Sequence, residues 1–300
     1  MEQQHEALAE LFEAHRDRLR TVAHRMLGSL PDADDAVQET WLRLARGDAS
    51  AIVNPAGWLT TVISRICLDM LRSREARREE PAGHPETLDH PDPTTRGDPE
   101  REALLADSAG RALLVVLDRL SPAERVAFVL HDVLAVPFDQ AAAVVDRSTA
   151  AAKQLASRAR RKVRGTPAVP ADELFRRRRV IEAFLAASRS GDIDAVLAVL
   201  APDVVRTADR AALPGGRPSE VRGAREVAGE VAVFGRNARF AEVALVDGVP
   251  GIVVAPHGRL RLVLTVTVEG DRVAGYRVVA DPLRLRDFDL AVLDHAPARG

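Results

Sequence analysis

Apolar residues recur at helical spacing through the first part of the chain. The spacing predicts three helices, over residues 8–27, 32–45 and 56–78. Gly28 and Pro31 separate the first two helices, because both residues favour the end of a helix. The third helix carries an apolar stripe formed by Leu59, Ile63, Ile66 and Met70.

The helical pattern stops in the stretch EEPAGHPETLDHPDPTTRGDPE, residues 79–100, which is rich in proline, glycine and acid. Such a stretch buries too little apolar surface to fold, so we expect a linker. Helices resume near Arg101 and continue to about Arg164. Within them, the run SPAE at residues 121–124 predicts a helix start, since serine caps, proline suits the first turn and glutamate completes a capping box.

A second, short linker, GTPAVPAD, leads into a region of different character. Two helical stretches, over residues 173–190 and 192–200, come first. Alternating apolar residues then predict a strand over residues 260–268, which a turn connects to a partner strand over residues 272–280. The last third of the chain is therefore expected to be α+β and the first two thirds all-α.

The segment from about Ser121 to Arg164 has the proportions of a helix-turn-helix. A short helix over Phe138–Val145 is followed by a tight turn in which Ser148 is a candidate N-cap. The next helix is basic, and a solvated basic face is one interpretation of it. The short preceding helix and the capped turn favour DNA binding instead. The side chains expected to face a major groove are Lys153, Gln154, Ser157, Arg158 and Arg161.

Composition narrows the class of protein. The 300 residues are 46% hydrophobic and 29% charged, and the net charge of -2 argues against indiscriminate nucleic-acid binding. No apolar run is long enough for a membrane span and the start of the chain is unlike a signal peptide, so we expect a cytoplasmic protein with no membrane partner. Cys67 is the only cysteine and no His/Cys cluster has ligand spacing, so we expect no metal and no cofactor.

The stretch LDRLSPAERVAFVLHDVLAVPFDQAAAVVDRSTAAAKQLASRARRKVRG resembles the promoter-reading domain of extracytoplasmic-function (ECF) RNA polymerase sigma factors. The resemblance implies binding to the upstream promoter element. Asp146 stands where glycine is common in the turn, but aspartate tolerates unusual backbone angles.

The stretch FEAHRDRLRTVAHRMLGSLPDADDAVQETWLRL is similar to the other domain of the same family, which binds core polymerase. The resemblance implies that its second helix docks on the clamp helices of the largest polymerase subunit. One face of that helix is acidic, with residues at i, i+3, i+4 and i+7. A solvated acidic face is the alternative interpretation of these residues. They are Asp35, Gln38, Glu39 and Leu42.

The following stretch, NPAGWLTTVISRICLDMLRSREARRE, resembles the segment that captures unstacked bases of the downstream promoter element. Trp58, Arg65, Asp69 and Arg72 are the candidate contacts, although Trp58 alone is better explained as a core residue. In this family the connection between the two sigma domains threads polymerase channels that nucleic acid otherwise uses, and the acidic linker of this chain is expected to do the same. A plain flexible tether is an equal alternative interpretation of the linker.

The last third resembles SnoaL-like domains, through AFLAASRSGDIDAVLAVLAPDVVRTADR and GIVVAPHGRLRLVLTVTVEGDRVAGYRVVADPLRL. The resemblance implies a cone-shaped α+β fold around a cavity and a small-molecule ligand. Asp203, Asp209 and His257 are the candidate catalytic residues, but their spacing forms no pair, so we expect a regulatory domain and no enzyme activity.

The predicted fold is thus multidomain: two all-α sigma domains, the second a helix-turn-helix, followed by an α+β cone-shaped SnoaL-like domain. The expected boundaries are residues 1–80, a linker over 81–100, residues 101–165 and residues 172–295. The predicted function is a sigma factor with RNA polymerase core and promoter DNA as partners, modulated by its own last domain. The alternative is a DNA-binding regulator fused to a SnoaL-like enzyme or sensor that never contacts polymerase. The acidic helix face and the lack of a heptad dimer seam favour the sigma factor.

Overall fold

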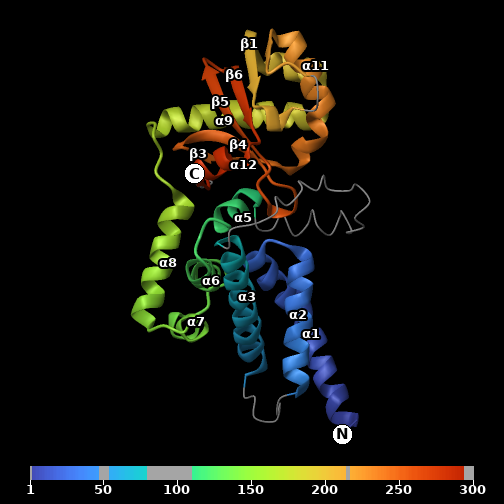
Figure 1. The fold of residues 1–300 in the computed structure, drawn as a ribbon, viewed down its shortest axis with the longest axis vertical. Helices are drawn as coiled ribbons and strands as arrows, with labels where there is room; N and C mark the ends of the chain where they lie inside the picture. Colours follow the sequence, from blue (N-terminus) through green and yellow to red (C-terminus); the bar gives the residue numbers. More distant parts are fainter. Residues whose placement is uncertain (1, 47–53, 80–109, 214–216, 294–300) are drawn as a thin grey trace, which may run out of the picture. The chain divides into compact units, whose positions relative to one another are not determined.

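The computed structural model describes residues 2–46, 54–79, 110–213 and 217–293 (Figure 1). The described residues divide into two compact units. The first contains residues up to 79 together with 117–160, and the second contains residues 110–116 together with 161–293. The expected linker over residues 81–100 lies outside the described residues.

The first unit begins with three mutually packed helices, α1 (Glu2–Leu27), α2 (Leu30–Arg46) and α3 (Pro55–Glu79). They agree with the three predicted helices to within a few residues, except that α1 begins earlier. Gly28 has a φ of 72° in the turn after α1, a backbone conformation that glycine adopts without strain. The buried side chains that join the three helices include Leu19, Met26, Leu44, Leu59 and Ile63.

The first unit continues with α6 (Pro122–Phe128), the π-helical turn η2 (Val129–Val133), α7 (Phe138–Val145) and most of α8 (Thr149–Arg164). The predicted capping box at the start of α6 is confirmed. The Glu124 N–H donates to Ser121 Oγ at 3.4 Å, and the Ser121 N–H donates to Glu124 Oε2 at 3.3 Å.

The second unit is a seven-stranded sheet with helices. Its strand order is β2-β1-β6-β5-β4-β3-β7. Only the β1–β6 pair is parallel among the pairs in this sheet. The strands are β1 (Leu200–Ala208), β2 (Glu220–Arg222), β3 (Ala241–Val246), β4 (Val249–Val254), β5 (Leu262–Glu269), β6 (Arg272–Val279) and β7 (Leu290–Ala291).

The helices of the second unit include α9 (Ala171–Ser190), which contacts β3, β4, β5 and β6, and α10 (Ile193–Val199). α11 (Ala224–Phe234) contacts β1 and β2. The remaining helical segments are α5 (Arg111–Leu117), α12 (Pro282–Asp287), η3 (Arg210–Ala212), η4 (Gly235–Phe240) and η5 (Pro256–Gly258).

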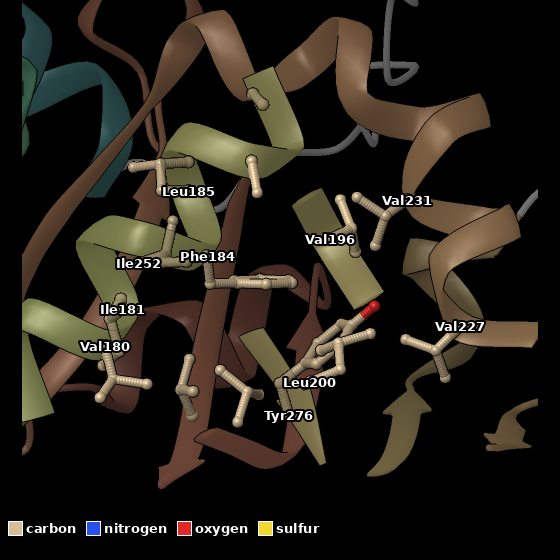
Figure 2. Packing of buried hydrophobic residues seen from close by; sticks show 14 of the residues in the cluster. Val180, Ile181, Phe184, Leu185, Val196, Leu200, Val227, Val231, Ile252 and Tyr276 are labelled. Carbon is tan, nitrogen blue, oxygen red and sulfur yellow. The ribbon is translucent and has the colours of Figure 1, made fainter. Parts of the chain in front are cut away.

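An apolar cluster fills the space between these helices and the sheet (Figure 2). The Phe184 ring of α9 and the Tyr276 ring of β6 are central to it, with their centroids 5.5 Å apart. Val196, Val227 and Val231 approach the same cluster from α10 and α11. The expected order of helical domains followed by an α+β domain is confirmed.

No helix within the described ranges is both long and apolar enough to cross a membrane. In the same part of the chain, no group of three His, Cys, Asp or Glu side chains is arranged to hold a metal ion.

Candidate nucleic-acid interface

Helices α7 and α8 form a helix-turn-helix with a tight connection. Asp146 ends α7 in the left-handed region, at a φ of 54°, and Ser148 Oγ accepts the Ala151 N–H at 3.2 Å as the predicted N-cap. The local sequence therefore explains the turn. A short polar side chain adopts the left-handed conformation, and serine satisfies a free N–H at the start of α8.

The upstream-element face is the set of five outward residues predicted on α8. All five side chains are exposed in the structure, and the opposite side of α8 buries Ala152, Ala156 and Ala159. Small residues on the buried side let α8 pack closely, while the long polar residues stay in water. The face comprises Lys153, Gln154, Ser157, Arg158 and Arg161.

Neighbouring side chains orient part of α8. Arg158 Nε lies 3.4 Å from the buried carboxylate of Glu124, although about half of the Arg158 side chain stays exposed. Arg160 donates from Nε to Asp132 at 2.7 Å. Lys153 Nζ lies 5.8 Å from the centre of the Phe138 ring. Cations held in this way lose less rotamer freedom when they bind an anion.

The core-binding face is the predicted set Asp35, Gln38, Glu39 and Leu42 on α2. Asp35, Gln38 and Leu42 are exposed, and Leu42 is 37% exposed. Glu39 is partly covered and accepts a hydrogen bond from Arg43 Nε at 3.0 Å. The structure thus brings an apolar side chain and acidic groups together on one helix face.

A groove between α1 and α2 adjoins this face, and the sequence did not reveal it. Its volume is about 710 Å³. Phe12 and Trp41 lie in it with their ring centroids 5.2 Å apart, and Gln38 belongs to both the groove and the core-binding face.

The downstream-element face is the predicted set Trp58, Arg65, Asp69 and Arg72 on α3. Trp58 is partly buried near the start of the helix, whereas the other three side chains are exposed. Arg72 Nη1 lies 3.9 Å from Asp69 Oδ1. Arg65 Nη2 donates to the Ala143 carbonyl of α7 at 2.9 Å, a contact that sequence alone did not predict.

The structure describes the side chains of two of the three candidate catalytic residues of the second unit. Asp203 is exposed on β1. The Asp209 carboxylate accepts the N–H groups of Ala212, Ala280 and Asp281 at 2.9–3.0 Å, so it holds the chain after β1 against the chain after β6. The backbone of His257 lies in η5, and its side chain is outside the described residues.

The second unit contains an ion pair that the sequence did not predict. The Arg206 side chain, 5% exposed, donates to both carboxylate oxygens of Glu230, at 2.9 Å from Nε and 2.6 Å from Nη2. Burial raises the pKa of nearby Tyr276, and the charge of Glu230 raises it too, whereas Arg206 lowers it. Arg206 directly follows Val204 and Val205, and an arginine in such an apolar run is the signal that could have found the pair.

Four contacts inside the second unit join residues that precede β1 to the sheet. The Glu242 carboxylate of β3 accepts the Ala112 N–H at 2.7 Å, and the Val292 N–H donates to the Val163 carbonyl at 2.8 Å. The Ala168 N–H donates to the Gly248 carbonyl at 2.8 Å. Gly165 is close to Ala291, because the Ala291 Cβ occupies the space that a Cβ on Gly165 would need. These are named the sheet contacts below.

Family models match both helical parts of the chain. The sigma-70 region 2 model matches residues 11–77, and the sigma-70 region 4 model matches residues 110–163. The first match contains the core-binding and downstream-element faces, and the second contains the upstream-element face.

Curated relatives extend the similarity over the rest of the chain. The chain is 45% identical over 219 residues to the ECF RNA polymerase sigma factor SigJ of Mycobacterium tuberculosis, covering 71% of this chain and 68% of SigJ. It is 34% identical over 283 residues to the probable ECF sigma factor SigI of the same species, covering 94% of this chain and 96% of SigI. The crystal structure of Mycobacterium tuberculosis SigJ aligns with a TM-score of 0.43 and 35% identity, over 93% of this chain and 98% of that one.

Proposed function

The chain belongs to the ECF RNA polymerase sigma factors, and from that premise we propose which of its surfaces perform promoter recognition. A sigma factor directs core polymerase to promoters and initiates transcription. We assign core polymerase to the core-binding face, the downstream promoter element to the downstream-element face, and the upstream element to the upstream-element face. These partners place its action in the cytoplasm.

The observation that carries the assignment is the upstream-element face. Its five polar or cationic side chains are all exposed on a helix that follows a capped turn. A helix of this kind enters the major groove, where arginine reads guanine and glutamine reads adenine. The charge of the face supports binding to DNA phosphates as well.

Core binding is assigned to α2 because the exposed Leu42 lies among carboxylates and an amide. A basic partner surface with an apolar depression complements such a face. The test is copurification of the full chain with core polymerase after Asp35→Lys with Glu39→Lys. We expect at least a tenfold loss of bound chain, and the matched charge change Glu10→Lys with Glu75→Lys, at exposed positions of α1 and α3, should keep binding. Equal binding by the two double variants would refute the assignment.

We further propose that the second unit modulates promoter recognition and has no enzyme activity. The sheet contacts support this role, because Ala112 and Val163 belong to region 4 and are bonded to the same sheet. A small-molecule ligand of the second unit could affect region 4 only if it bound more tightly to one arrangement of the sheet contacts than to another. The three backbone donors on the Asp209 carboxylate favour a structural role for that residue.

Glu242→Gln tests the modulation within the full chain. The substitution weakens the charged hydrogen bond to Ala112 and keeps the side-chain volume. We expect open-complex formation to change at least threefold at matched concentrations of core polymerase. Glu220→Gln on the exposed strand β2 is the control and should have no effect. An unchanged rate for Glu242→Gln would argue that the second unit acts independently.

A further inference from the structure

A row of polar residues crosses strands β2, β1 and β6 on the face of the sheet opposite the apolar cluster. Thr207 of β1 pairs with Arg277 of β6 on one side and with Glu220 of β2 on the other. Their chain neighbours Arg206 and Tyr276 lie on the helix-covered face, because successive residues of a strand alternate between the two faces. The row therefore faces away from the core of the second unit.

A pocket of about 240 Å³ adjoins this row, and we name it the outer-face pocket. Thr207 and Arg277 line it from the sheet, Ser219 lines it from the residue before β2, and Arg284 lines it from α12. Pockets for drug-sized ligands measure roughly 300–1000 Å³, so the outer-face pocket suits a smaller molecule. All of its lining residues belong to the second unit.

The two carboxylates at the outer-face pocket already bind other groups. Asp209 accepts three backbone N–H groups, as described above. Glu220 Oε1 accepts a hydrogen bond at 2.6 Å from Nε of Arg222, which does not line the pocket. Both carboxylates therefore direct hydrogen bonds at groups other than the arginines of the pocket.

The two arginines of the outer-face pocket, Arg277 and Arg284, lack such partners. Both side chains are exposed, and neither guanidinium has an ion pair or a hydrogen bond among the described residues. Two cations at one small pocket repel each other, and an anion between them would replace the repulsion by attraction. The pocket therefore offers two free guanidiniums to a ligand.

The backbone that carries these arginines is held in place from two sides. Asp209 ties the chain after β1 to the start of α12, and Asp281 Oδ1 accepts the N–H groups of Leu283 and Arg284 at 2.9 and 3.1 Å. Arg277 belongs to β6, which is paired with both β1 and β5. Because the backbone is fixed before a ligand arrives, binding orders only the side chains.

A phosphate monoester matches this set of donors better than a carboxylate does. A phosphate monoester carries about 1.5 to 2 negative charges at pH 7 and has three strong acceptor oxygens. It can therefore accept paired N–H groups from two guanidiniums at once. The hydroxyls of Thr207 and Ser219 are further donors at the pocket. A carboxylate has one charge and two oxygens, which a single guanidinium satisfies.

We propose that the outer-face pocket binds a small phosphorylated molecule, with Arg277 and Arg284 on the phosphate oxygens and the Thr207 hydroxyl donating to the same group. This site is separate from the space between the sheet and the helices, which the apolar cluster fills. It does not depend on the modulation of region 4 proposed above, so its test measures binding and not transcription.

The test is calorimetric titration of the full chain with ribose 5-phosphate at low salt, because salt screens exposed charges. We expect one molecule to bind per chain, at least tenfold more weakly to Arg277→Ala and to Arg284→Ala, and ribose without phosphate not to bind. Arg225→Ala is the matched control, since Arg225 is an exposed arginine of α11 that does not line the pocket. Its affinity should stay within twofold of the unaltered chain. No binding of ribose 5-phosphate, or equal losses in all three variants, would overturn the proposal.

Thr207→Val tests the hydroxyl without a change in charge. Valine keeps the branched shape that suits a strand, so β1 should still pair with both of its neighbours. We expect the affinity for ribose 5-phosphate to fall at least threefold. An unchanged affinity would contradict a phosphate bound beside Thr207.

DNA carries phosphate groups too, so a second titration distinguishes the two sources. A DNA duplex of random sequence is titrated into the unaltered chain and into Arg277→Ala, with and without saturating ribose 5-phosphate. We expect duplex affinity to stay within twofold in all four cases. A duplex affinity that falls at least tenfold in Arg277→Ala, and that ribose 5-phosphate lowers in the unaltered chain, would assign the pocket to the DNA backbone and overturn the small-molecule ligand.

Discussion

The Nε atom of Arg158 lies 3.4 Å from the Oε1 atom of Glu124, so a residue of the upstream-element face is paired with the carboxylate that caps α6. The Glu124 side chain is 8% exposed and also accepts the Ser121 N–H. One buried carboxylate therefore completes a helix start and limits where the guanidinium of the reading helix can point.

Glu124→Gln should separate these two roles. Glutamine can still complete the capping box, but it no longer attracts Arg158 by charge. We expect discrimination between upstream-element sequences to fall by about 1 kcal/mol or less, because Arg158 is half exposed. Asp132→Asn is the control, since Asp132 pairs with Arg160 outside the face. Competition binding to matched and mismatched elements measures the difference, and equal effects of both variants would exclude orientation of Arg158 by Glu124.

Base reading and phosphate binding on α8 should respond differently to mutation. Arg158→Ala and Arg161→Ala should each reduce binding to the preferred element by about 1–3 kcal/mol and relax specificity. Lys162→Ala should lower affinity evenly for all sequences and reduce the magnitude of the salt slope by about 1. Titrations at several salt concentrations distinguish the two classes. If all three variants behave alike, the helix binds only the DNA backbone.

Local sequence predicted the helix-turn-helix well because its determinants are local. Ser121, Glu124 and Ser148 accept hydrogen bonds from N–H groups three residues away, and Asp146 adopts the left-handed conformation at the end of α7. The outward residues of α8 followed from helical periodicity alone. Their roles in promoter recognition remain predictions.

Contacts between distant segments could not be derived in the same way. Helix α3 buries Thr60 and Ser64 in addition to its apolar stripe, and nothing nearby in sequence indicates that α3 also contacts α6 and α7. The sequence did not predict strands β1, β3 and β4. Strand β1 pairs with β6, which lies more than sixty residues later in the chain, and β4 is buried along most of its length. A strand without alternation lacks the periodic signal that identified β5.

The Arg206–Glu230 pair should contribute to the stability of the second unit because it is largely buried. Glu230→Ala leaves Arg206 buried without its carboxylate, and we expect the free energy of unfolding to fall by about 3–5 kcal/mol. Arg222 and Glu220 form the control pair, with side chains 70% and 47% exposed. Glu220→Ala should change stability by about 0.5 kcal/mol or less. Urea unfolding followed by circular dichroism compares the two, and equal losses would contradict the role of burial.

Cys67 should make stability depend on alkaline pH. Burial raises the pKa of its thiol from 9.0 to about 12. Because the folded pKa is raised, the stabilisation is fully present below pH 9 and is lost as pH rises from 9 to 12. Between pH 8 and pH 10, the unaltered protein should lose about 1.4 kcal/mol more than Cys67→Ala. Urea titrations at the two pH values measure this difference, and parallel losses would show that the thiol ionises normally.

The most direct measurement of the central claim is promoter-specific transcription by core polymerase and the full chain on a library of random upstream sequences. Sequencing of the transcripts identifies the elements that the chain selects. We predict that the unaltered chain selects a defined set of promoters with two separated conserved elements. Arg158→Ala should change the selected upstream element. Asp35→Lys combined with Glu39→Lys should give no specific transcripts. Specific binding of the chain to DNA with no transcript above core polymerase alone would contradict the account.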